Sequence, residues 1–536
     1  MATIHEELIT KHTMKPKSLT LRAPVRLLQT AVTLGIAADW LFHDKPLGLS
    51  LLLFVLLVVG GLWWNGRSEA IIPTKRNLWL LLPLFFFAGM AIFRTASTLT
   101  TLNVLVVLCL LAYLAFFYAA GRVENMNLLG YALLPLRVFG RSLALSAPVI
   151  GPSVQEMRVN GNGRRHLFPL LRGLLLALPV LLVFTVLLSS ADLIFADHVD
   201  QLFSLYIFSQ MAEWLWRGTL ILLLSVLLTG GLALALTRRA DDDEQSDLER
   251  TLDTLPNHLS IGFIETSTIL LLVNMLFAAF VAIQFTYLFA GVANVTEAGY
   301  TFADYARRGF FELLTVAILS MLLVLGLNWL TRRENKGQIR LFNGLGSVLV
   351  GLVLVLLVSA WRRMALYEAT FGYTELRLIV YVFMCWLGLT LVWFLLTLWL
   401  RPDRFAIGAL LAVMGFVATL NLINPDAFIA RQNLDRYEQS GDLDAAYLAS
   451  LSDDAVPELV RGLSLTVGDA ETQLTPICAR SWLSDELDCY ATPHEILLTE
   501  LNGRYQSLTT DTNWQRWTSF NLPRWQVFNL LGFLAD

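Results

Sequence analysis

The run VLVGLVLVLLV (348–358) contains no polar side chain, and LLLALPVLLVFTVLL (174–188) contains only one, Thr185. Of the 536 residues, 56% are hydrophobic and 15% are charged, and the mean hydropathy is +0.60. A typical soluble domain is about 45–50% apolar and about 25% charged. An apolar run of about 20 residues is what a helix needs to cross a bilayer, whereas a soluble core does not need one. The sequence therefore predicts a multi-pass integral membrane protein.

Apolar runs bounded by charged or turn residues predict about eleven membrane spans. Their backbones must be helical, because lipid offers no partner for an unpaired amide group. The predicted fold class is thus all-α, a multi-pass transmembrane helical bundle followed by a small soluble α-helical C-terminal domain. The predicted spans are 27–43, 47–64, 78–94, 99–120, 168–190, 214–237, 262–290, 309–331, 341–360, 377–400 and 405–424.

The distribution of basic residues predicts the orientation. With a cytoplasmic N-terminus, the inner loops hold 23 Lys and Arg residues and the outer loops hold 7, which is the asymmetry expected for cytoplasmic loops. We therefore expect a protein of the bacterial cytoplasmic membrane with its N-terminus inside and its C-terminus outside. The expected parts are a basic cytoplasmic tail (1–26), a first group of four transmembrane helices (27–120), a cytoplasmic loop (121–167), a transmembrane core of about seven helices (168–424) and an extracytoplasmic α-helical domain (425–536).

The cytoplasmic loop contains one more apolar stretch, residues 128–150. Pro135 interrupts it, and Arg137 and Arg141 lie four residues apart, on one face of a helix. This pattern favours an amphipathic helix on the membrane surface. The alternative, a further span, would move every later loop to the other side.

The C-terminal region lacks lysine and is rich in acidic residues. Residues 425–439, 453–463 and 493–506 have helical spacing and helix-start residues, which predicts short helices in a compact domain. Cys478 and Cys489 have no histidine at metal-binding spacing, so zinc is disfavoured. In an oxidising compartment they are candidates for a disulfide.

A charged stripe precedes the span 309–331. Asp304, Arg308 and Glu312 are spaced four and four, with Arg307 beside them, so on a helix they would share one side. One interpretation is a salt-bridged helix start. The other is an anion site that binds, for example, a lipid phosphate.

Polar residues also occur within one long predicted span. Glu265, Asn274 and Gln284 form a candidate polar track, because ionisable and polar groups at membrane depth usually face the bundle interior. Ordinary interhelical hydrogen bonding is the alternative interpretation.

Signals for catalysis are scarce. Asp192, Asp197, His198 and Asp200 are weak candidates for a divalent-cation site, but the same segment also fits an amphipathic surface helix, and we expect no metal. The chain has no phosphate-binding loop and no nucleophile elbow. We therefore predict no catalytic residues and no cofactor, and the question of enzymatic activity stays open. The basic residues gather only at the membrane surface, so binding of nucleic acid has no support.

Three stretches carry a family resemblance: NMLFAAFVAIQFTYLFAG (274–291) followed by YTFADYARRGFFELLTVAIL (300–319), SSADLIFADHVDQL (189–202), and NPDAFIARQNLDRY (424–437). Over roughly residues 165–470 the chain resembles a bacterial membrane-protein family, domain of unknown function 4173. The resemblance implies a multi-pass bacterial protein with a soluble tail, and it implies no activity.

Three functional hypotheses follow. The first is a non-enzymatic sensor or scaffold of the bacterial envelope that contacts membrane lipids and binds a protein partner through residues 425–536. The second is a transporter or lipid-translocating protein that uses the intramembrane polar residues. The third is a membrane-embedded enzyme that acts on lipid-linked substrates.

Overall fold

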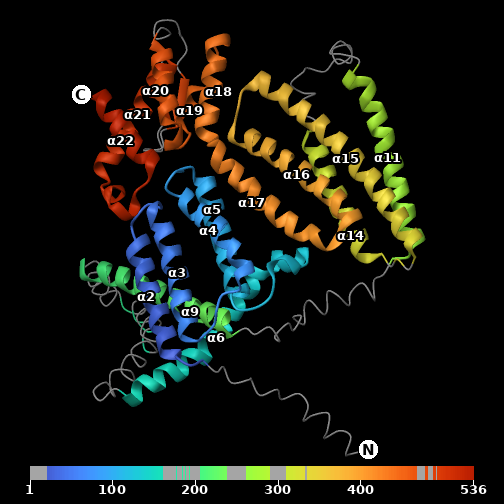
Figure 1. Cartoon of the computed structure of the whole chain (residues 1–536). Helices are drawn as coiled ribbons and strands as arrows, with labels where there is room; N and C mark the ends of the chain where they lie inside the picture. Colours follow the sequence, from blue (N-terminus) through green and yellow to red (C-terminus); the bar gives the residue numbers. More distant parts are fainter. Residues whose placement is uncertain are drawn as a thin grey trace, which may run out of the picture.

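The computed structural model describes residues 21–160, 206–237, 261–289, 310–331, 335–467, 477–480, 487–490 and 492–535, together with a few single positions between these ranges. These residues form an all-α protein with one short pair of strands (Figure 1). Most helices run through the body of the molecule, and a smaller group of short helices sits at one end of it. The predicted fold class is confirmed.

Within the described ranges, ten helices are long and apolar enough to cross a membrane. They are α2 (Pro24–Phe42), α3 (Leu49–Ser68), α5 (Ser97–Phe117), α6 (Leu128–Asn160), α9 (Tyr206–Thr237), α11 (Phe263–Phe289), α14 (Phe310–Leu330), α15 (Lys336–Phe371), α16 (Glu375–Leu400) and α17 (Phe405–Ile423).

The set differs from the prediction at three places. Of the predicted span 168–190, only single positions are described. The predicted span 78–94 is only the ten-residue helix α4 (Leu81–Met90), which follows the 3-10 turn η1 (Lys75–Leu80). Ten helical residues extend about 15 Å, half of the hydrocarbon thickness of a bilayer. The third difference is α6, which covers the predicted surface helix 128–150.

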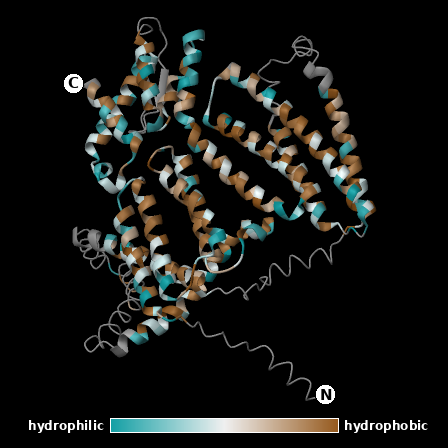
Figure 2. Ribbon diagram, viewed as in Figure 1, coloured by the Kyte–Doolittle hydropathy of each residue, from teal (hydrophilic) through white to brown (hydrophobic). Residues whose placement is uncertain are grey.

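The long helices pack in two clusters with separate apolar cores. The first core contains buried residues of α2, α3, α4, α5, α6 and α9, and the second contains those of α11, α14, α15 and α16. Helix α17 belongs to both, because Met414 and Val417 lie in the first core and Phe405 lies in the second. Apolar residues run along most of these helices (Figure 2).

Connections between helices gather on two opposite faces. We call one of them the domain face. There the connections 43–48, 91–96 and 372–374 meet the C-terminal helices: Leu49 donates its N–H to Phe520 O, and the Tyr373 N–H binds the Asn433 side chain.

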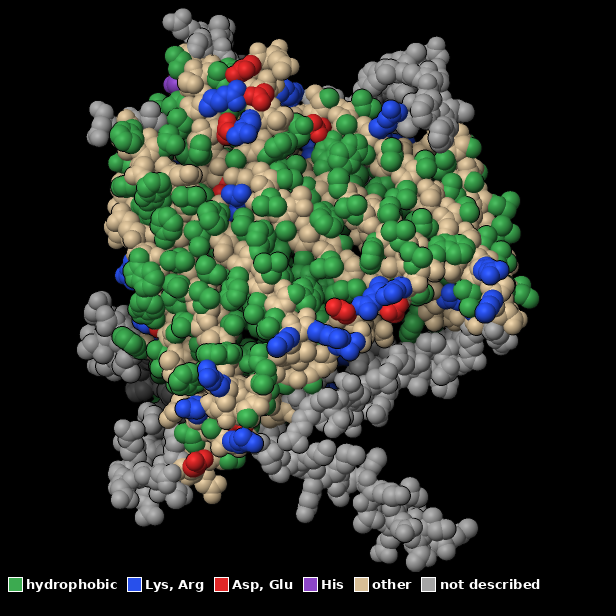
Figure 3. Space-filling view, in the orientation of Figure 1, with side chains coloured by type: hydrophobic (Ala, Val, Ile, Leu, Met, Phe, Trp, Pro, Cys, Tyr) green, Lys and Arg blue, Asp and Glu red, His purple; other side chains and the backbone are tan. Residues whose placement is uncertain are grey.

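We call the other the opposite face. There the connections 69–74, 118–127 and 401–404 meet one another: the Thr74 N–H binds Tyr118 O, and Arg404 pairs with Glu124 at 2.9 Å. Between the faces, Figure 3 shows a broad apolar surface with Lys and Arg side chains along its lower border.

Helix α6 begins on the opposite face. The Tyr131 N–H binds Asn127 O, and the Tyr113 hydroxyl of α5 donates to Tyr131 O at 2.9 Å. In Figure 1, α6 runs obliquely across the lower ends of α2 and α5. It buries one stripe, and the remainder of its surface is largely exposed; the stripe is Tyr131, Leu134, Val138, Ser142, Ser146, Val149 and Ser153. This single buried stripe is the pattern of an amphipathic helix, although α6 also meets the length and hydropathy of a span.

The C-terminal helices form a third cluster with its own core. They are α18 (Pro425–Ser440), α19 (Ala445–Ala449), the 3-10 turn η5 (Asp453–Ala455), α20 (Val456–Leu465), α21 (Pro493–Thr510), the 3-10 turns η7 (Asn513–Gln515) and η8 (Trp517–Ser519), and α22 (Leu522–Ala535). The unpredicted strands β1 (Ile477–Arg480) and β2 (Leu487–Tyr490) pair antiparallel, with Cys478 opposite Cys489.

Candidate functional site

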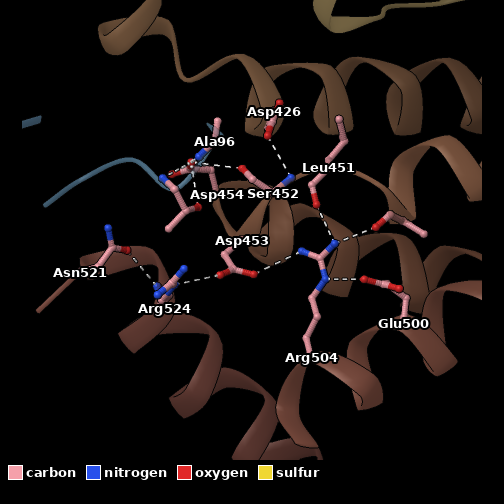
Figure 4. Close-up of polar contacts among 12 residues, drawn as sticks. Ala96, Asp426, Leu451, Ser452, Asp453, Asp454, Glu500, Arg504, Asn521 and Arg524 are labelled. Atoms are coloured by element: carbon pink, nitrogen blue, oxygen red, sulfur yellow. Dashed lines mark hydrogen bonds and ion pairs between the residues drawn. The ribbon is translucent and has the colours of Figure 1, made fainter. Parts of the chain in front are cut away.

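The sequence SDD at residues 452–454 lies where the C-terminal domain meets the membrane helices. Asp453 and Asp454 begin the 3-10 turn η5, in which successive side chains point about 120° apart. They therefore point to different neighbours (Figure 4). Asp453 faces arginines of its own domain, and Asp454 faces the connection between α4 and α5.

Asp454 is nearly enclosed, with a side chain only 1% exposed. Its Oδ2 accepts hydrogen bonds from the N–H groups of Thr95 at 2.7 Å and Ala96 at 3.0 Å, and from the Thr95 hydroxyl at 3.0 Å. Helix α5 begins at Ser97 and has no side-chain cap of its own. A carboxylate close to the positive end of a helix is stabilised there by the helix dipole. A residue of the C-terminal domain thus supplies an anion at the start of a membrane helix.

Arg94 completes the surroundings of Asp454. Its Nη1 lies 3.9 Å from Asp454 Oδ1, an oxygen that makes no hydrogen bond among the described residues. Burial raises the pKa of the Asp454 carboxyl above its usual value and lowers the pKa of the Arg94 guanidinium. Their mutual attraction acts against both shifts, and the amide hydrogen bonds act against the shift of Asp454 alone, so burial of this pair carries a desolvation cost.

Arg94 also connects this site to the bundle interior. Its Nε donates to Asn421 O at 2.8 Å. The Asn421 side chain forms two reciprocal amide hydrogen bonds with Asn103 of α5, at 2.9 and 2.7 Å, and both side chains are fully buried. Continuous polar contacts therefore run from Asp454 to the interface between α5 and α17.

Asp453 is held on the domain side. It lies 3.5 Å from Arg504 Nη1 and 3.7 Å from Arg524 Nε. Arg504 is itself buried, donates to Glu500 at 2.7 Å, and donates from Nη2 to the carbonyls of Ala449 and Leu451. These bonds fix the chain that leads into SDD. Asp426, in the first turn of α18, accepts the Ser452 N–H at 2.9 Å.

A second set of backbone contacts joins the same parts. Asn521 donates from Nδ2 to Ala91 O at 2.9 Å and to Arg94 O at 3.3 Å. The Leu522 N–H binds Ile92 O at 2.8 Å. The connection 91–96 is therefore held between η5 and the start of α22. We call the contacts of Asp454 and Asn521 with residues 91–96 the junction.

The three residues of the predicted polar track lie in three different environments. Glu265 is exposed, and its carboxylate accepts the Gly262 N–H at 3.1 Å at the start of α11. Asn274 is buried and donates to Leu345 O of α15 at 3.0 Å. Gln284 is buried nearer the other end of α11. The structure does not bring these three side chains together.

Other predicted positions fall partly outside the described residues. Glu312 is exposed in the first turn of α14, whereas Asp304, Arg307 and Arg308 lie outside the described ranges. Asp192 is exposed, and Asp197, His198 and Asp200 lie outside. For Cys478 and Cys489 only the backbone is described, and it sets them directly opposite each other.

One group of potential metal ligands occurs among the described residues. It joins His43 and Asp44, after α2, to Glu213 on α9, with His43 Nε2 at 3.1 Å from each carboxylate. Both carboxylates are largely exposed, and Arg217 lies 3.8 Å from Glu213. We interpret the group as polar contacts that hold the connection after α2 against α9.

Sequence reasoning did not single out the junction residues. Asp454 is one of many acids in the C-terminal region, and Arg94 is one of seven basic residues in predicted outer loops. One available signal was that Asn421 interrupts an apolar span. The partner that makes Asp454 distinctive, the connection 91–96, is more than 350 positions away.

The fold and the junction define a multi-pass membrane protein whose C-terminal domain docks on one face of its helices. The chain belongs to the family described as Domain of unknown function (DUF4153), which matches residues 81–462. No curated protein and no solved structure matches the chain.

This membership corrects the resemblance to domain of unknown function 4173, which was wrong. The resemblance rested on three short stretches, and the longest of them is mostly apolar. Helices of unrelated membrane proteins share such apolar composition because the bilayer selects it. The match also begins at residue 81, so it includes α4, the connection 91–96 and α5, and it ends within α20. Asp454 and its partners on residues 94–96 all lie inside the matched region.

Proposed function

We propose that the chain is a non-enzymatic sensor or scaffold of the bacterial envelope, in which the C-terminal domain receives a partner or a signal and the junction conveys it to the membrane helices. The observation that supports this most directly is the burial of Asp454 against the start of α5. A domain tethered only by a flexible linker would have no such contact.

The chemistry of the junction suits a conditional contact. A buried carboxylate is stable only while its hydrogen bonds and its cation stay in place. A shift of the turn 450–455 would therefore disturb Thr95, Ala96 and Arg94 together. Arg94 in turn contacts the backbone of Asn421, whose side chain joins α17 to α5. Switching in proteins usually depends on a contact with two discrete arrangements, and we propose that the junction is such a contact.

We further propose that the domain face is extracytoplasmic and the opposite face cytoplasmic. Of the residues expected in inner loops, Arg122 and Arg401 belong to connections of the opposite face, and Arg67 lies in the last turn of α3, next to the connection 69–74. On the domain face, Arg94 is ion-paired with Asp454 and Arg217 with Asp39. The clustering of basic residues towards one side supports this orientation.

The decisive experiment compares three forms of the full-length protein in cross-linked membranes of its native host: wild type, Asp454→Ala/Asn521→Ala, and the control Glu438→Ala/Asp442→Ala, which removes two exposed acids of the same domain. Proteins that co-purify are identified by mass spectrometry, and the exposure of residues 91–96 is followed by hydrogen–deuterium exchange.

We expect a reproducible partner whose binding changes amide exchange at residues 91–96 in wild type and control, but not in the junction variant. A partner whose binding leaves these amides unchanged in wild type would contradict conveyance through the junction. Catalytic turnover by purified protein on lipid-linked substrates, without any partner, would replace the proposal with the enzymatic hypothesis.

A transporter or lipid-translocating protein is the second candidate, and one observation favours it. Asn274 Oδ1 and Gln284 Nε2 are buried and make no hydrogen bond within the described part of the chain. Unsatisfied amide groups at membrane depth are costly, and they are common where a polar substrate passes. Loss of substrate flux on Gln284→Leu, with partner binding intact, would support this candidate.

A further inference from the structure

A crevice of about 470 Å³ opens where the two helix clusters meet, between the start of α6, the last turns of α14 and the start of α17. Its volume is in the range of sites that take a small molecule or part of a lipid, about 300–1,000 Å³. It lies close to the opposite face, next to the connections 118–127 and 401–404, and far from the junction.

The walls of the crevice are mainly apolar. Leu322, Gly326 and Trp329 of α14 line it at spacings of four and three, which is one side of a helix. Leu129 of α6 and Phe405 of α17 face them. Gly326 produces the hollow, because a β-carbon at this position would meet no atom within 4 Å.

The rim of the crevice is charged. Arg137 of α6, half-buried, lines it, as does Asp403. Asp403 lies 3.5 Å from Arg404, which also pairs with Glu124 at 2.9 Å, so Arg404 balances both acids in part. The first amide groups of α6 add the positive end of a long helix. The rim therefore offers an anion two kinds of hydrogen-bond donor, the Arg137 guanidinium and the amide groups at the start of α6, above an apolar floor.

We infer that this crevice binds one anionic phospholipid, with its phosphate at Arg137 and an acyl chain along Leu322, Gly326 and Trp329. In a membrane, an apolar hollow is filled by hydrocarbon, since water would find few hydrogen-bond partners in it. A guanidinium at the membrane surface matches a phosphate in charge and geometry. Free phosphate would use the rim but not the floor. The inference is independent of the proposed role of the C-terminal domain.

The test measures lipid bound to full-length protein in detergent, with phosphatidylglycerol and phosphatidylcholine of identical acyl chains as probes and native mass spectrometry as the readout. Wild type should retain one phosphatidylglycerol in preference to phosphatidylcholine. Arg137→Gln should lower phosphatidylglycerol retention about fivefold. The control Arg141→Gln, an exposed arginine one turn further along α6, should bind like wild type.

A second variant tests the apolar floor and does not depend on the arginine. Gly326→Leu should fill the crevice and reduce retention of both lipids, whereas Gly351→Leu, another glycine with open space around it on α15, should not. Equal retention by Arg137→Gln and Arg141→Gln, or by Gly326→Leu and Gly351→Leu, would overturn the site. Competition by inorganic phosphate as effective as that by phosphatidylglycerol would overturn its assignment to a lipid.

Discussion

Two adjacent aspartates illustrate how position, and not residue type, determines a role at the residue scale. Asp453 is partly exposed and shared between Arg504 and Arg524, so its charge is balanced within the C-terminal domain. The Asp454 side chain points away from its own domain, and its charge is balanced by the N–H groups of residues 95–96 and by Arg94. Because the two parts meet around one carboxylate, its removal should affect both.

Asp454→Ala should destabilise the protein by about 2–4 kcal/mol, since it leaves two amide donors and a buried guanidinium without their acceptor. Thermal unfolding of the purified protein in detergent measures this. The control Asp442→Ala removes an acid whose side chain is 79% exposed and which lies 3.5 Å from Arg436, and it should cost no more than about 0.5 kcal/mol. Equal losses in the two variants would show that the junction contributes nothing special.

The raised pKa of Asp454 gives a pH dependence of known sign. Its pKa in the folded protein lies above the usual value of 3.8 because burial disfavours the charged form. The folded state therefore binds this proton more readily than the unfolded state, and the corresponding stability is present below pH 3.8 and is lost as the pH rises through the folded pKa.

The wild type should thus gain stability relative to Asp454→Asn as the pH is lowered from neutrality towards 4. The asparagine cannot titrate, so the difference between the two melting temperatures isolates this one group. The comparison is made in a series of buffers of equal ionic strength. A difference that stays constant, or that shifts in favour of the variant on acidification, would mean that the amide donors and Arg94 outweigh burial.

At the scale of elements, α6 and α9 approach unusually closely. A β-carbon at Gly230 would overlap the Ser142 carbonyl group, which is backbone and cannot rotate away. The neighbouring Gly231 meets only the Ser142 side chain, at an ordinary 3.6 Å. Small residues are the usual means by which membrane helices come into close contact.

Gly230→Ala should therefore destabilise the protein by about 1–3 kcal/mol, because α6 must move away from α9. Gly231→Ala is the matched control and should be close to neutral. The two are compared by thermal unfolding in the same detergent. A neutral Gly230→Ala would show that α6 is not held against α9 at this point.

Sequence periodicity did not settle how α6 lies. Its apolar length satisfies the requirement for a span, while its arginines and its single buried stripe fit a surface helix. Hydropathy cannot separate the two, because both need an apolar face. The place of α6 across the lower ends of α2 and α5 comes from packing (Figure 1).

At the scale of the whole molecule, the prediction that matters most is orientation. Strand register sets Cys478 opposite Cys489, and directly opposed residues of an antiparallel pair have Cα atoms about 4.5–5.5 Å apart, within the range for a disulfide. The disulfide stays a prediction, and it requires an oxidising compartment.

In intact cells, a thiol reagent that cannot cross the membrane should label Cys478 and Cys489 only after treatment with a reductant that also cannot cross it. Cys478→Ser/Cys489→Ser is the control for labelling elsewhere. Failure to label the reduced protein in intact cells, with labelling in lysed cells, would place the C-terminal domain in the cytoplasm. The proposed orientation, and a sensor of the outer envelope, would then be wrong.

The sequence by itself determined the membrane-spanning, helical character of this protein and the approximate position of most spans, because a bilayer imposes a length and a hydropathy that each segment satisfies locally. It also indicated helices at the start of the C-terminal domain, where α18 and α20 lie. Only the tertiary structure decided that the domain docks on the connection 91–96, which acid enters that contact, and which polar residues face one another. Those choices depend on pairs of residues hundreds of positions apart, and the free energy of burying Asp454 is set by its partners, which no local pattern of residue types records.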